Sequence, residues 1–211
     1  MSADPNWVAA WTRGWSMSRD VAPPVPAYGG WHVDVGLPDQ QARYVFAAVS
    51  DDVRRASMEI DGQYTFLKAC AEPGALTNHL AAGWILRPQG FFMDRPSLSA
   101  GGCRPVAHYD LSVVNVRQGV WTIEASTMGS IAARGSVLIV DRFAIFDRIE
   151  TDASHRRKGL GRAIVAQLAS IAVTEGATHG LLVATPDGRA LYETIGWRVH
   201  SPYSTAVRTE I

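Results

Sequence analysis

The chain has 211 residues, of which 47% are apolar, and this is enough to build a buried core. Its 20 Lys and Arg residues balance its 20 Asp and Glu residues. A global basic field that would favour binding to nucleic acid or to an anionic membrane is therefore excluded. We expect no nucleic-acid or membrane partner, and any anion site must be local.

The first twenty residues lack a basic start followed by an apolar run, and eighteen consecutive apolar residues occur nowhere. These features predict a cytoplasmic protein. Cys70 and Cys103 are too few for a disulfide framework and are not spaced as metal ligands, while the six histidines form no ligand pair. We expect both thiols to be reduced and structural, and we expect no metal.

The N-terminal region begins with a helix signal. Asp4 and Pro5 are typical of an N-cap and a first-turn proline, and Trp7, Trp11 and Trp15 then recur on one helical face. We expect this aromatic face to pack on the body of the protein rather than to stack on a cofactor. The proline- and glycine-rich residues 21–30 predict a linker, and residues 31–49 predict extended chain around a Leu-Pro-Asp turn.

The second half has the pattern of a β-meander followed by alternating helices and strands. Four β-rich runs are separated by short turn sequences, which predicts antiparallel strands. The runs are 110–116, 120–126, 130–140 and 144–151. Apolar residues at helical spacing then predict a helix ending near Gly176, a buried strand over 179–185, and a short helix over 189–196. The expected fold class is α/β (α+β), with a mixed central sheet flanked by helices.

An internal similarity suggests how the chain is organised. Residues 67–84 align with residues 182–197, with Leu at the start, Pro and Gly in the turn, and Gly-Trp at the end. Two readings stay open: the N-terminal half is a degenerate copy of the C-terminal half, or two strand-turn-helix units resemble each other by chance. We divide the chain into residues 1–104 and residues 105–211. No Arg-x-x-Gly-x-Gly occurs in the first region, so one anion site is predicted.

The most informative stretch is SHRRKGLGRA, residues 154–163. Three consecutive cations precede two glycines, which open a helix directly after a strand. Glycines allow close approach to the main chain, and a helix N-terminus carries partial positive charge, so the pattern favours a phosphate. The stretch lacks the GK[ST] ending of nucleoside-triphosphate loops and the GxGxxG of dinucleotide folds.

The stretch resembles [RQ]-x-x-G-x-[GA], the pyrophosphate loop of the GNAT superfamily of N-acetyltransferases. The segment GRALYETIGW, residues 188–197, is similar to the LYxxxGF segment of that family, with Trp197 in the aromatic position. The resemblance covers residues 107–208. It implies the acyl-CoA N-acyltransferase fold, with a mostly antiparallel sheet, and acetyl-CoA as cosubstrate.

The resemblance also implies roles for individual residues. Main-chain groups of Ile149 and Thr151 would pair with the pantetheine arm, and Arg156 takes the first position of the motif. The amides of the following residues would hold the pyrophosphate; these are Arg157, Lys158, Gly159, Leu160, Gly161 and Arg162. The alternative for the cations is that they form a solvated surface.

Acetyl transfer requires a neutral amine and a leaving thiolate. An alkyl amine with a pKa of ~10.4 costs about 4 to 5 kcal/mol to deprotonate at pH 7, so a base, a water chain or a desolvated pocket must compensate. The thiolate, with a pKa near ~8.5, can be protonated by a tyrosine. Tyr192 matches the tyrosine of LYxxxGF, which the resemblance implies is the general acid. The alternative is a tyrosine that only packs its ring.

The general base is less clearly marked. Many family members carry a glutamate at the position of Ile145, so this chain departs from the pattern. Strand alternation predicts that Asp147, Ile149 and Thr151 share one face, which makes Asp147 the first candidate. Glu124 in the preceding strand is the second candidate. Either carboxylate could instead be structural, with water as the base.

Together these features predict an N-acetyltransferase that moves an acetyl group from acetyl-CoA to a primary amine by direct attack in a ternary complex. No cysteine lies in a catalytic motif, which argues against an acetyl-enzyme. A small-molecule amine is favoured over a protein amine, with residues 1–104 contributing to the acceptor site. The alternative is a catalytically lapsed, coenzyme A-responsive regulatory module. Acceptor identity, acyl preference and oligomeric state are not readable from the sequence.

Overall fold

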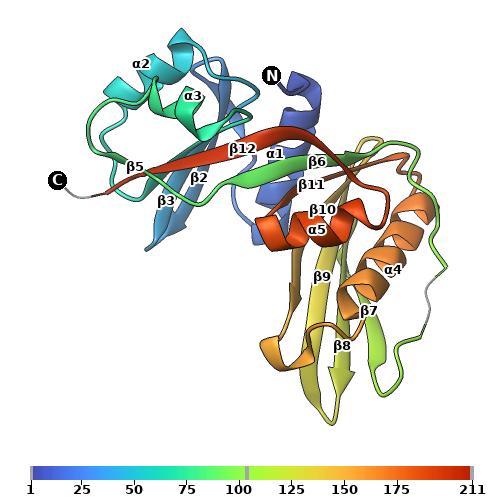
Figure 1. Ribbon diagram of the computed structural model, residues 1–211. Helices are drawn as coiled ribbons and strands as arrows, with labels where there is room; N and C mark the ends of the chain where they lie inside the picture. Colours follow the sequence, from blue (N-terminus) through green and yellow to red (C-terminus); the bar gives the residue numbers. More distant parts are fainter. Residues whose placement is uncertain (1, 103–104, 210–211) are drawn as a thin grey trace. The chain divides into compact units, whose positions relative to one another are not determined.

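The computed structural model describes residues 2–102 and 105–209 (Figure 1). The chain forms two compact units. Unit 1 comprises residues 1–93, 183–190 and 199–211, and unit 2 comprises residues 94–182 and 191–198. Within the described ranges, no helix is long and apolar enough to cross a membrane.

Unit 2 contains the predicted meander. Its four strands pair antiparallel in chain order, and glycines with positive φ, Gly119 and Gly129, occupy two of the connecting turns. The strands are β7 (Asp110–Arg117), β8 (Val120–Thr127), β9 (Ser130–Val140) and β10 (Phe143–Thr151). The strand predictions from Tyr109 onward are therefore confirmed.

Helix α4 (Leu160–Thr174) follows β10 after a 3₁₀ turn, η1 (Ala153–His155), and packs on β8, β9 and β10 (Figure 1). A Cβ atom on Gly135 would lie 2.7 Å from the Ile164 side chain, so the glycine allows the helix to approach the sheet closely. Strand β11 (His179–Ala184) runs parallel to β10, and helix α5 (Pro186–Glu193) comes next. The predicted helix over 189–196 begins and ends three residues earlier, because Pro186 opens its first turn.

Unit 1 contains the remaining elements. Strands β3 and β4 are parallel, with helix α2 between them in the chain. The elements are α1 (Pro5–Arg19), β1 (Val25–Ala27), β2 (Gly30–Leu37), β3 (Gln40–Phe46), α2 (Asp51–Glu59), β4 (Thr65–Ala69), α3 (Pro73–Thr77), β5 (Trp84–Leu86), β6 (Gly90–Arg95) and β12 (Arg198–Arg208). The predicted linker over 21–30 is partly wrong, since β1 lies in it and pairs with β2.

Helices cover both faces of the unit 1 sheet. Helices α2 and α3 contribute Val53, Ala56 and Leu76 to a core with Leu67 and Ala206 of the sheet. On the other side, the tryptophan face of α1 packs on the body of the unit as predicted. Its contacts include Trp11 against Phe92 and Tyr203, at ring distances of 6.3 and 5.5 Å. As expected, Asp4 caps α1 by accepting a hydrogen bond from the Asn6 amide.

The two halves of the chain share an order of elements. The run β3-α2-β4-α3-β5 in the first half corresponds to β10-α4-β11-α5-β12 in the second, and the first two strands of each run are parallel. Strand β12, from the end of the chain, pairs antiparallel with both β4 and β5. The compact units consequently do not follow the division into residues 1–104 and 105–211. The predicted mixed, mostly antiparallel fold with flanking helices is confirmed.

Candidate functional site

The site begins where two parallel strands separate. Residues Phe143–Ile145 of β10 pair with His179–Leu181 of β11, and the pairing stops there although β10 continues to Thr151. Among the residues that the structure describes, the backbone of β10 beyond Ile145 therefore has no strand partner on its β11 side. An extended ligand could pair with these backbone groups as a strand would.

A β-bulge changes which side chains of β10 share a face. Asp147 lies opposite Ser136 and Glu150 lies opposite Arg134, so three steps on β10 match two on β9, and Arg148 has a φ of 53°. Asp147 consequently shares a face with Glu150. The predicted common face for Asp147, Ile149 and Thr151 is wrong. Ile149 instead points to the side of α4, where its Cγ1 lies 3.0 Å from the position of a Cβ on Gly135.

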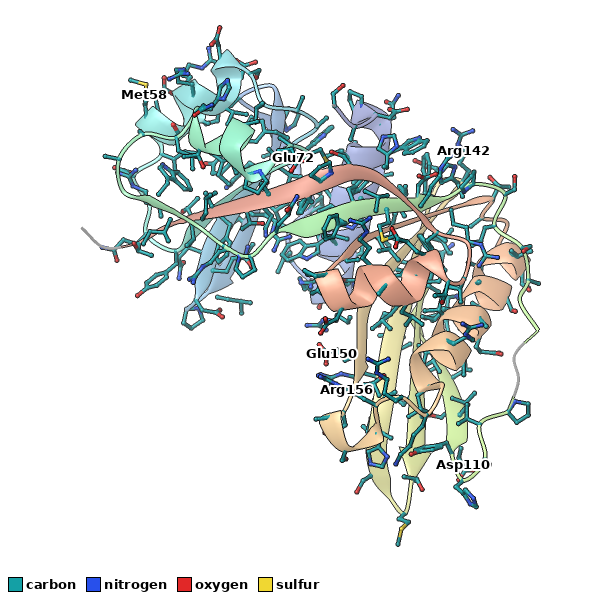
Figure 2. The ribbon with its side chains drawn as sticks, viewed as in Figure 1. Met58, Glu72, Asp110, Arg142, Glu150 and Arg156 are labelled. Atoms are coloured by element: carbon teal, nitrogen blue, oxygen red, sulfur yellow. The ribbon has the colours of Figure 1, made fainter. Side chains whose placement is uncertain are left out.

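The loop between β10 and α4 carries the predicted cations. Arg156, Arg157 and Lys158 are exposed, and Figure 2 shows Arg156 and Glu150 near the end of β10. The Arg156 guanidinium donates to the Thr151 carbonyl at 3.4 Å. Asp152 opens η1 by accepting from the Ser154 amide and from the Ser154 hydroxyl, and the hydroxyl bond first and the amide bond second lower the pKa of the Asp152 carboxyl.

The helix N-terminus has the geometry of an anion cradle. Gly159 is the N-cap of α4, with a φ of 86° and no capping side chain. The first amide shown bonding within the helix is that of Ala163, to the Gly159 carbonyl at 3.1 Å. The amides of Leu160, Gly161 and Arg162 therefore precede the helical hydrogen-bond ladder. A Cβ atom on Gly161 would lie 3.0 Å from Leu191 Cδ2, so this position also favours glycine.

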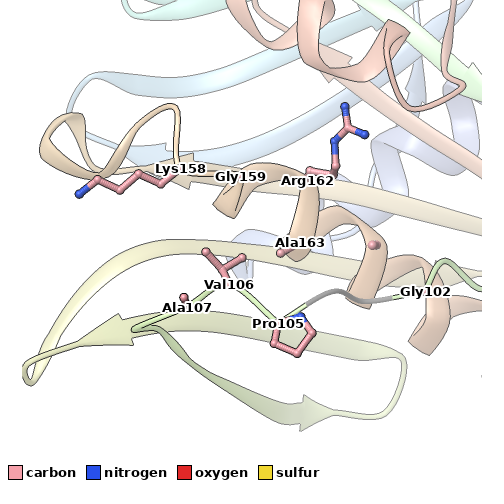
Figure 3. A pocket seen from close by; sticks show the side chains of 9 residues that line it. Gly102, Pro105, Val106, Ala107, Lys158, Gly159, Arg162 and Ala163 are labelled. Atoms are coloured by element: carbon pink, nitrogen blue, oxygen red, sulfur yellow. The ribbon is translucent and has the colours of Figure 1, made fainter.

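A cavity of about 600 Å³ lies beside the start of α4 (Figure 3). Lys158, Gly159 and Arg162 line it from the loop and helix, and Pro105 and Val106 line it from the opposite side. In Figure 3 the Arg162 side chain extends away from Pro105. Its guanidinium donates to Thr194 Oγ1 at 3.2 Å. The cavity brings two of the predicted cations, Lys158 and Arg162, together with residues 105–107, for which the sequence predicted no role.

A contact between Tyr109 and His155, which the sequence did not predict, holds the loop in place. Tyr109 Oη and His155 Nδ1 are 2.7 Å apart, and their rings meet edge to face with centres 5.6 Å apart. His155 belongs to η1, directly before the cations. The pair ties the entry to β7 to the start of the loop, over 46 residues of chain.

Tyr192 is buried, with 7% of its surface exposed. Its ring meets Trp197 edge to face at 5.8 Å, and Trp197 in turn meets Phe146 of β10 at 5.0 Å. Burial raises the pKa of Tyr192 far above its usual value, and the nearby Asp147 carboxylate raises it further. Tyr192 is therefore protonated at neutral pH.

The two candidate bases differ in their surroundings. Asp147 is close enough to act on the pKa of Tyr192. Glu124 lies opposite Arg134, whose guanidinium bonds Glu150 at 2.9 Å. Glu124 is therefore part of a row of surface charges on this face, whereas Asp147 is brought to the tyrosine.

The remaining candidates for a functional role are the two cysteines and any cluster of metal ligands. Cys70 is fully buried, and desolvation raises the pKa of its thiol to about 12, which fits a structural role. Cys103 lies outside the described residues. In the part of the chain that the structure describes, no three His, Cys, Asp or Glu side chains are grouped as metal ligands would be.

Comparison with known proteins decides the fold. A family model described as FR47-like protein matches residues 131–205. A GCN5-related N-acetyltransferase from Kribbella flavida superposes with a TM-score of 0.65 at 16% identity, covering 97% of this chain and 96% of that one. The chain has the GNAT fold.

Other GNAT structures extend this likeness. A GCN5-related N-acetyltransferase from Sphaerobacter thermophilus gives a TM-score of 0.57 at 10% identity, covering 100% of this chain and 96% of that one. A tandem GNAT protein from the clavulanic acid biosynthesis pathway gives 0.54 at 13% identity, covering 69% and 65%. No curated protein sequence matches the chain. The FR47-like match spans most of β9, then β10, the loop, α4, β11 and α5, and most of β12.

Proposed function

We propose that this protein is an acetyl-CoA-dependent N-acetyltransferase that acts on a primary amine of a small molecule in the cytoplasm. The observation that carries the proposal is the juxtaposition in unit 2 of the unpaired end of β10, the glycine-rich start of α4 and the buried Tyr192. The FR47-like match over the same segment supports it.

Acetyl-CoA supplies an activated acetyl thioester, and the residues of the cradle fit its shape and charge. Gly159 and Gly161 leave the α4 amides open to a pyrophosphate, and Arg156, Arg157 and Lys158 add positive charge around it. Backbone groups of Ile149 and Thr151 would pair with the pantetheine arm. The bond from Arg156 to the Thr151 carbonyl must then open or be shared.

Tyr192 would act at the sulfur of the thioester. Its strongly raised pKa makes complete proton transfer to a thiolate of pKa ~8.5 unfavourable. Donation of a hydrogen bond from Tyr192 Oη to the developing thiolate is favourable, and solvent then supplies the proton. This refines the general-acid role that the sequence implies.

Asp147 is our first choice for the group that takes the amine proton, because it lies near Tyr192. Glu124, held opposite Arg134, is the second choice. Direct attack by the amine in a ternary complex is proposed, since the buried Cys70 thiol is not a nucleophile at neutral pH. Residues 1–104 would contribute to the acceptor site.

The test is calorimetric titration with acetyl-CoA, followed by a panel of amines assayed for release of free thiol. Tyr192→Phe should lose turnover by about 10- to 100-fold while acetyl-CoA binds as before. Wild type that binds acetyl-CoA but acetylates no amine would favour the alternative, a lapsed coenzyme A-responsive module. No binding at all would refute both.

A further inference from the structure

Unit 1 contains a cavity of about 430 Å³ to which the proposed function assigns no ligand. All of its lining residues belong to that unit. The strand register shows why there is space here. Strand β4 pairs with β12 up to Ala69 and Ser204, so residues 199–202 of β12, which line the cavity, lie beyond the end of β4. The volume is within the range of pockets that hold small molecules.

Three further segments complete the lining of the cavity. The chain after β4 supplies Glu72 directly before α3 (Figure 2), and the start of β6 supplies Phe91. A Cβ atom on Gly90 would lie 3.1 Å from the Ala184 carbonyl oxygen, so β6 begins directly beside the end of β11. Helix α5, which follows β11, brings the Arg189 guanidinium to 4.6 Å from the centre of the Phe91 ring.

Glu72 gives the cavity a carboxylate. Its Oε2 accepts a hydrogen bond from the neutral Gln89 side-chain amide at 3.4 Å. Within residues 2–102 and 105–209, no Lys, Arg or His side chain forms an ion pair with Glu72. A carboxylate has about four lone-pair sites, so one neutral donor leaves room for a cation. The Glu72 side of the cavity is therefore suited to an ammonium group.

Arg189 gives the same cavity a positive charge. The side chain is half-buried, and its position over the Phe91 ring is favourable for a guanidinium. A guanidinium has five N–H donors in a fixed fork that matches a carboxylate, so Arg189 can bind an anion in addition to its contacts within the protein. Opposite charges thus line one cavity, and they are not paired with each other.

The rest of the lining is apolar or neutral. Val199 and Pro202 add apolar surface to that of Phe91. His200 Nε2 accepts from the Asp4 amide at 3.4 Å, which leaves the proton of a neutral imidazole on Nδ1. The cavity therefore offers one negative charge, one positive charge and an apolar surface.

We propose that this cavity binds a small zwitterion with the chemistry of an amino acid that has an apolar side chain. The ligand's ammonium pairs with Glu72, its carboxylate accepts from the Arg189 guanidinium, and its side chain packs on the apolar lining around Phe91. A ligand with a single charge would be repelled by one of the two charged side chains. The site does not rest on the proposed function, since it lies in unit 1 and needs no coenzyme.

The test is calorimetric titration of the full chain at pH 7 with L-leucine, in the absence of acetyl-CoA. Two analogues of leucine each lack one charge: 4-methylpentanoate has no ammonium, and 3-methylbutylamine has no carboxylate. We expect saturable binding of leucine with a Kd below about 1 mM, and binding of each analogue that is weaker by about tenfold or more.

Variants assign the two charges. Glu72→Gln and Arg189→Gln should each weaken leucine binding by about tenfold or more, because each removes one charge-assisted contact. The matched control is Arg55→Gln in helix α2. The Arg55 guanidinium lies 5.7 Å from the centre of the Tyr28 ring, and Arg55 is not among the lining residues, so the variant should bind leucine as wild type does.

Absence of saturable leucine binding to the wild type overturns the site. An analogue that binds as tightly as leucine overturns its preference for a zwitterion. Unchanged leucine affinity in Glu72→Gln or in Arg189→Gln shows that leucine binds elsewhere and likewise overturns the site. If Arg189→Gln does not fold, Glu72→Gln, at an exposed position, decides in its place. Because acetyl-CoA is absent, a failure of acetyl transfer leaves each of these outcomes unchanged.

Discussion

At the scale of single residues, the sequence indicated Tyr192, but it did not indicate that Asp147 lies close enough to raise the pKa of Tyr192. The LYETIGW segment marked Tyr192, but nothing in the sequence placed a carboxylate beside it. Asp147 keeps the regular register of β10 with β9, and the bulge at Arg148 turns Ile149, not Asp147, to the other face. A strand bulge depends on the register with β9, which a single strand sequence does not reveal.

Replacing Asp147 tests its role as base. In Asp147→Asn we expect kcat/KM for the amine to fall by about 100-fold at pH 7 and the apparent optimum to rise, because the amine must then lose its proton to solvent. Acetyl-CoA affinity should not change. The pH-rate profile is the measurement, and the same profile of Glu124→Gln tests the second candidate base on the same face. A profile that keeps its shape in Asp147→Asn removes this residue from the mechanism.

At the scale of elements, local signals predicted most boundaries correctly. The Asp4-Pro5 start of α1, the turns of the meander and the glycine-led start of α4 depend on neighbouring residues only, so their sequence patterns are sufficient. Strand β1 was missed because Val25–Ala27 extends only when β2 is available to pair with it. The Tyr109–His155 contact was missed for the same reason, as its partners are far apart in the chain.

The cradle can be tested with a pair of glycines in matching conformations. Gly159 and Gly129 have φ values of 86° and 78°, and neither would bring a Cβ within 4 Å of another group. Alanine at either position should therefore destabilise the fold by a similar amount, about 1 kcal/mol. Only Gly159→Ala should weaken acetyl-CoA binding, which calorimetry can measure. Equal affinities in the two variants would contradict the placement of the pyrophosphate at α4.

At the scale of the whole molecule, β12 determines how the chain must fold. It is the last strand in sequence, yet it pairs with β4 and β5 of the first half, and its Ala206 and Val207 are almost completely buried there. The shared element order of the two halves is compatible with a degenerate repeat. Whether residues 67–84 descend from a copy of residues 182–197 stays a hypothesis.

Because β12 pairs with β4 and β5 of the first half, we predict that residues 105–211 do not fold alone. The isolated fragment lacks β4 and β5, so it exposes the buried face of β12, and we expect aggregation or a non-cooperative thermal transition. Mixing it with a fragment of residues 1–104 should restore a cooperative transition in circular dichroism. A cooperative transition of the 105–211 fragment by itself would show that β12 has another partner.

Stability should also depend on pH in a defined direction. Burial lowers the pKa of His179 and of His32, against the opposing effects of Asp94 and Asp34 respectively. Around His179, the Arg142 and Arg198 charges lower its pKa further. The unfolded chain, with histidine pKa values near ~6.5, then binds protons that the folded chain does not. The contribution of these two histidines to the free energy of unfolding is therefore fully present above a pH of about 6.5. It is lost as the pH falls below that value towards the folded pKa values.

Urea unfolding at pH 7.5, 6.5 and 5.5 measures this dependence. The double variant His32→Gln, His179→Gln should lose most of the decrease between pH 7.5 and 5.5, since it has neither titrating group. An undiminished decrease in the variant would assign it to other groups.

By itself the sequence determined the class of fold, the meander, the position of the glycine-rich loop before α4 and the resemblance to GNAT acetyltransferases. Those properties follow from periodicity, turn residues and a contiguous motif, and all of these are local. Only the tertiary structure decided that Asp147 lies close enough to Tyr192 to raise its pKa and that β12 completes the sheet of unit 1. These arrangements join residues that are distant in the chain, and strand register and packing, not local preference, bring them together.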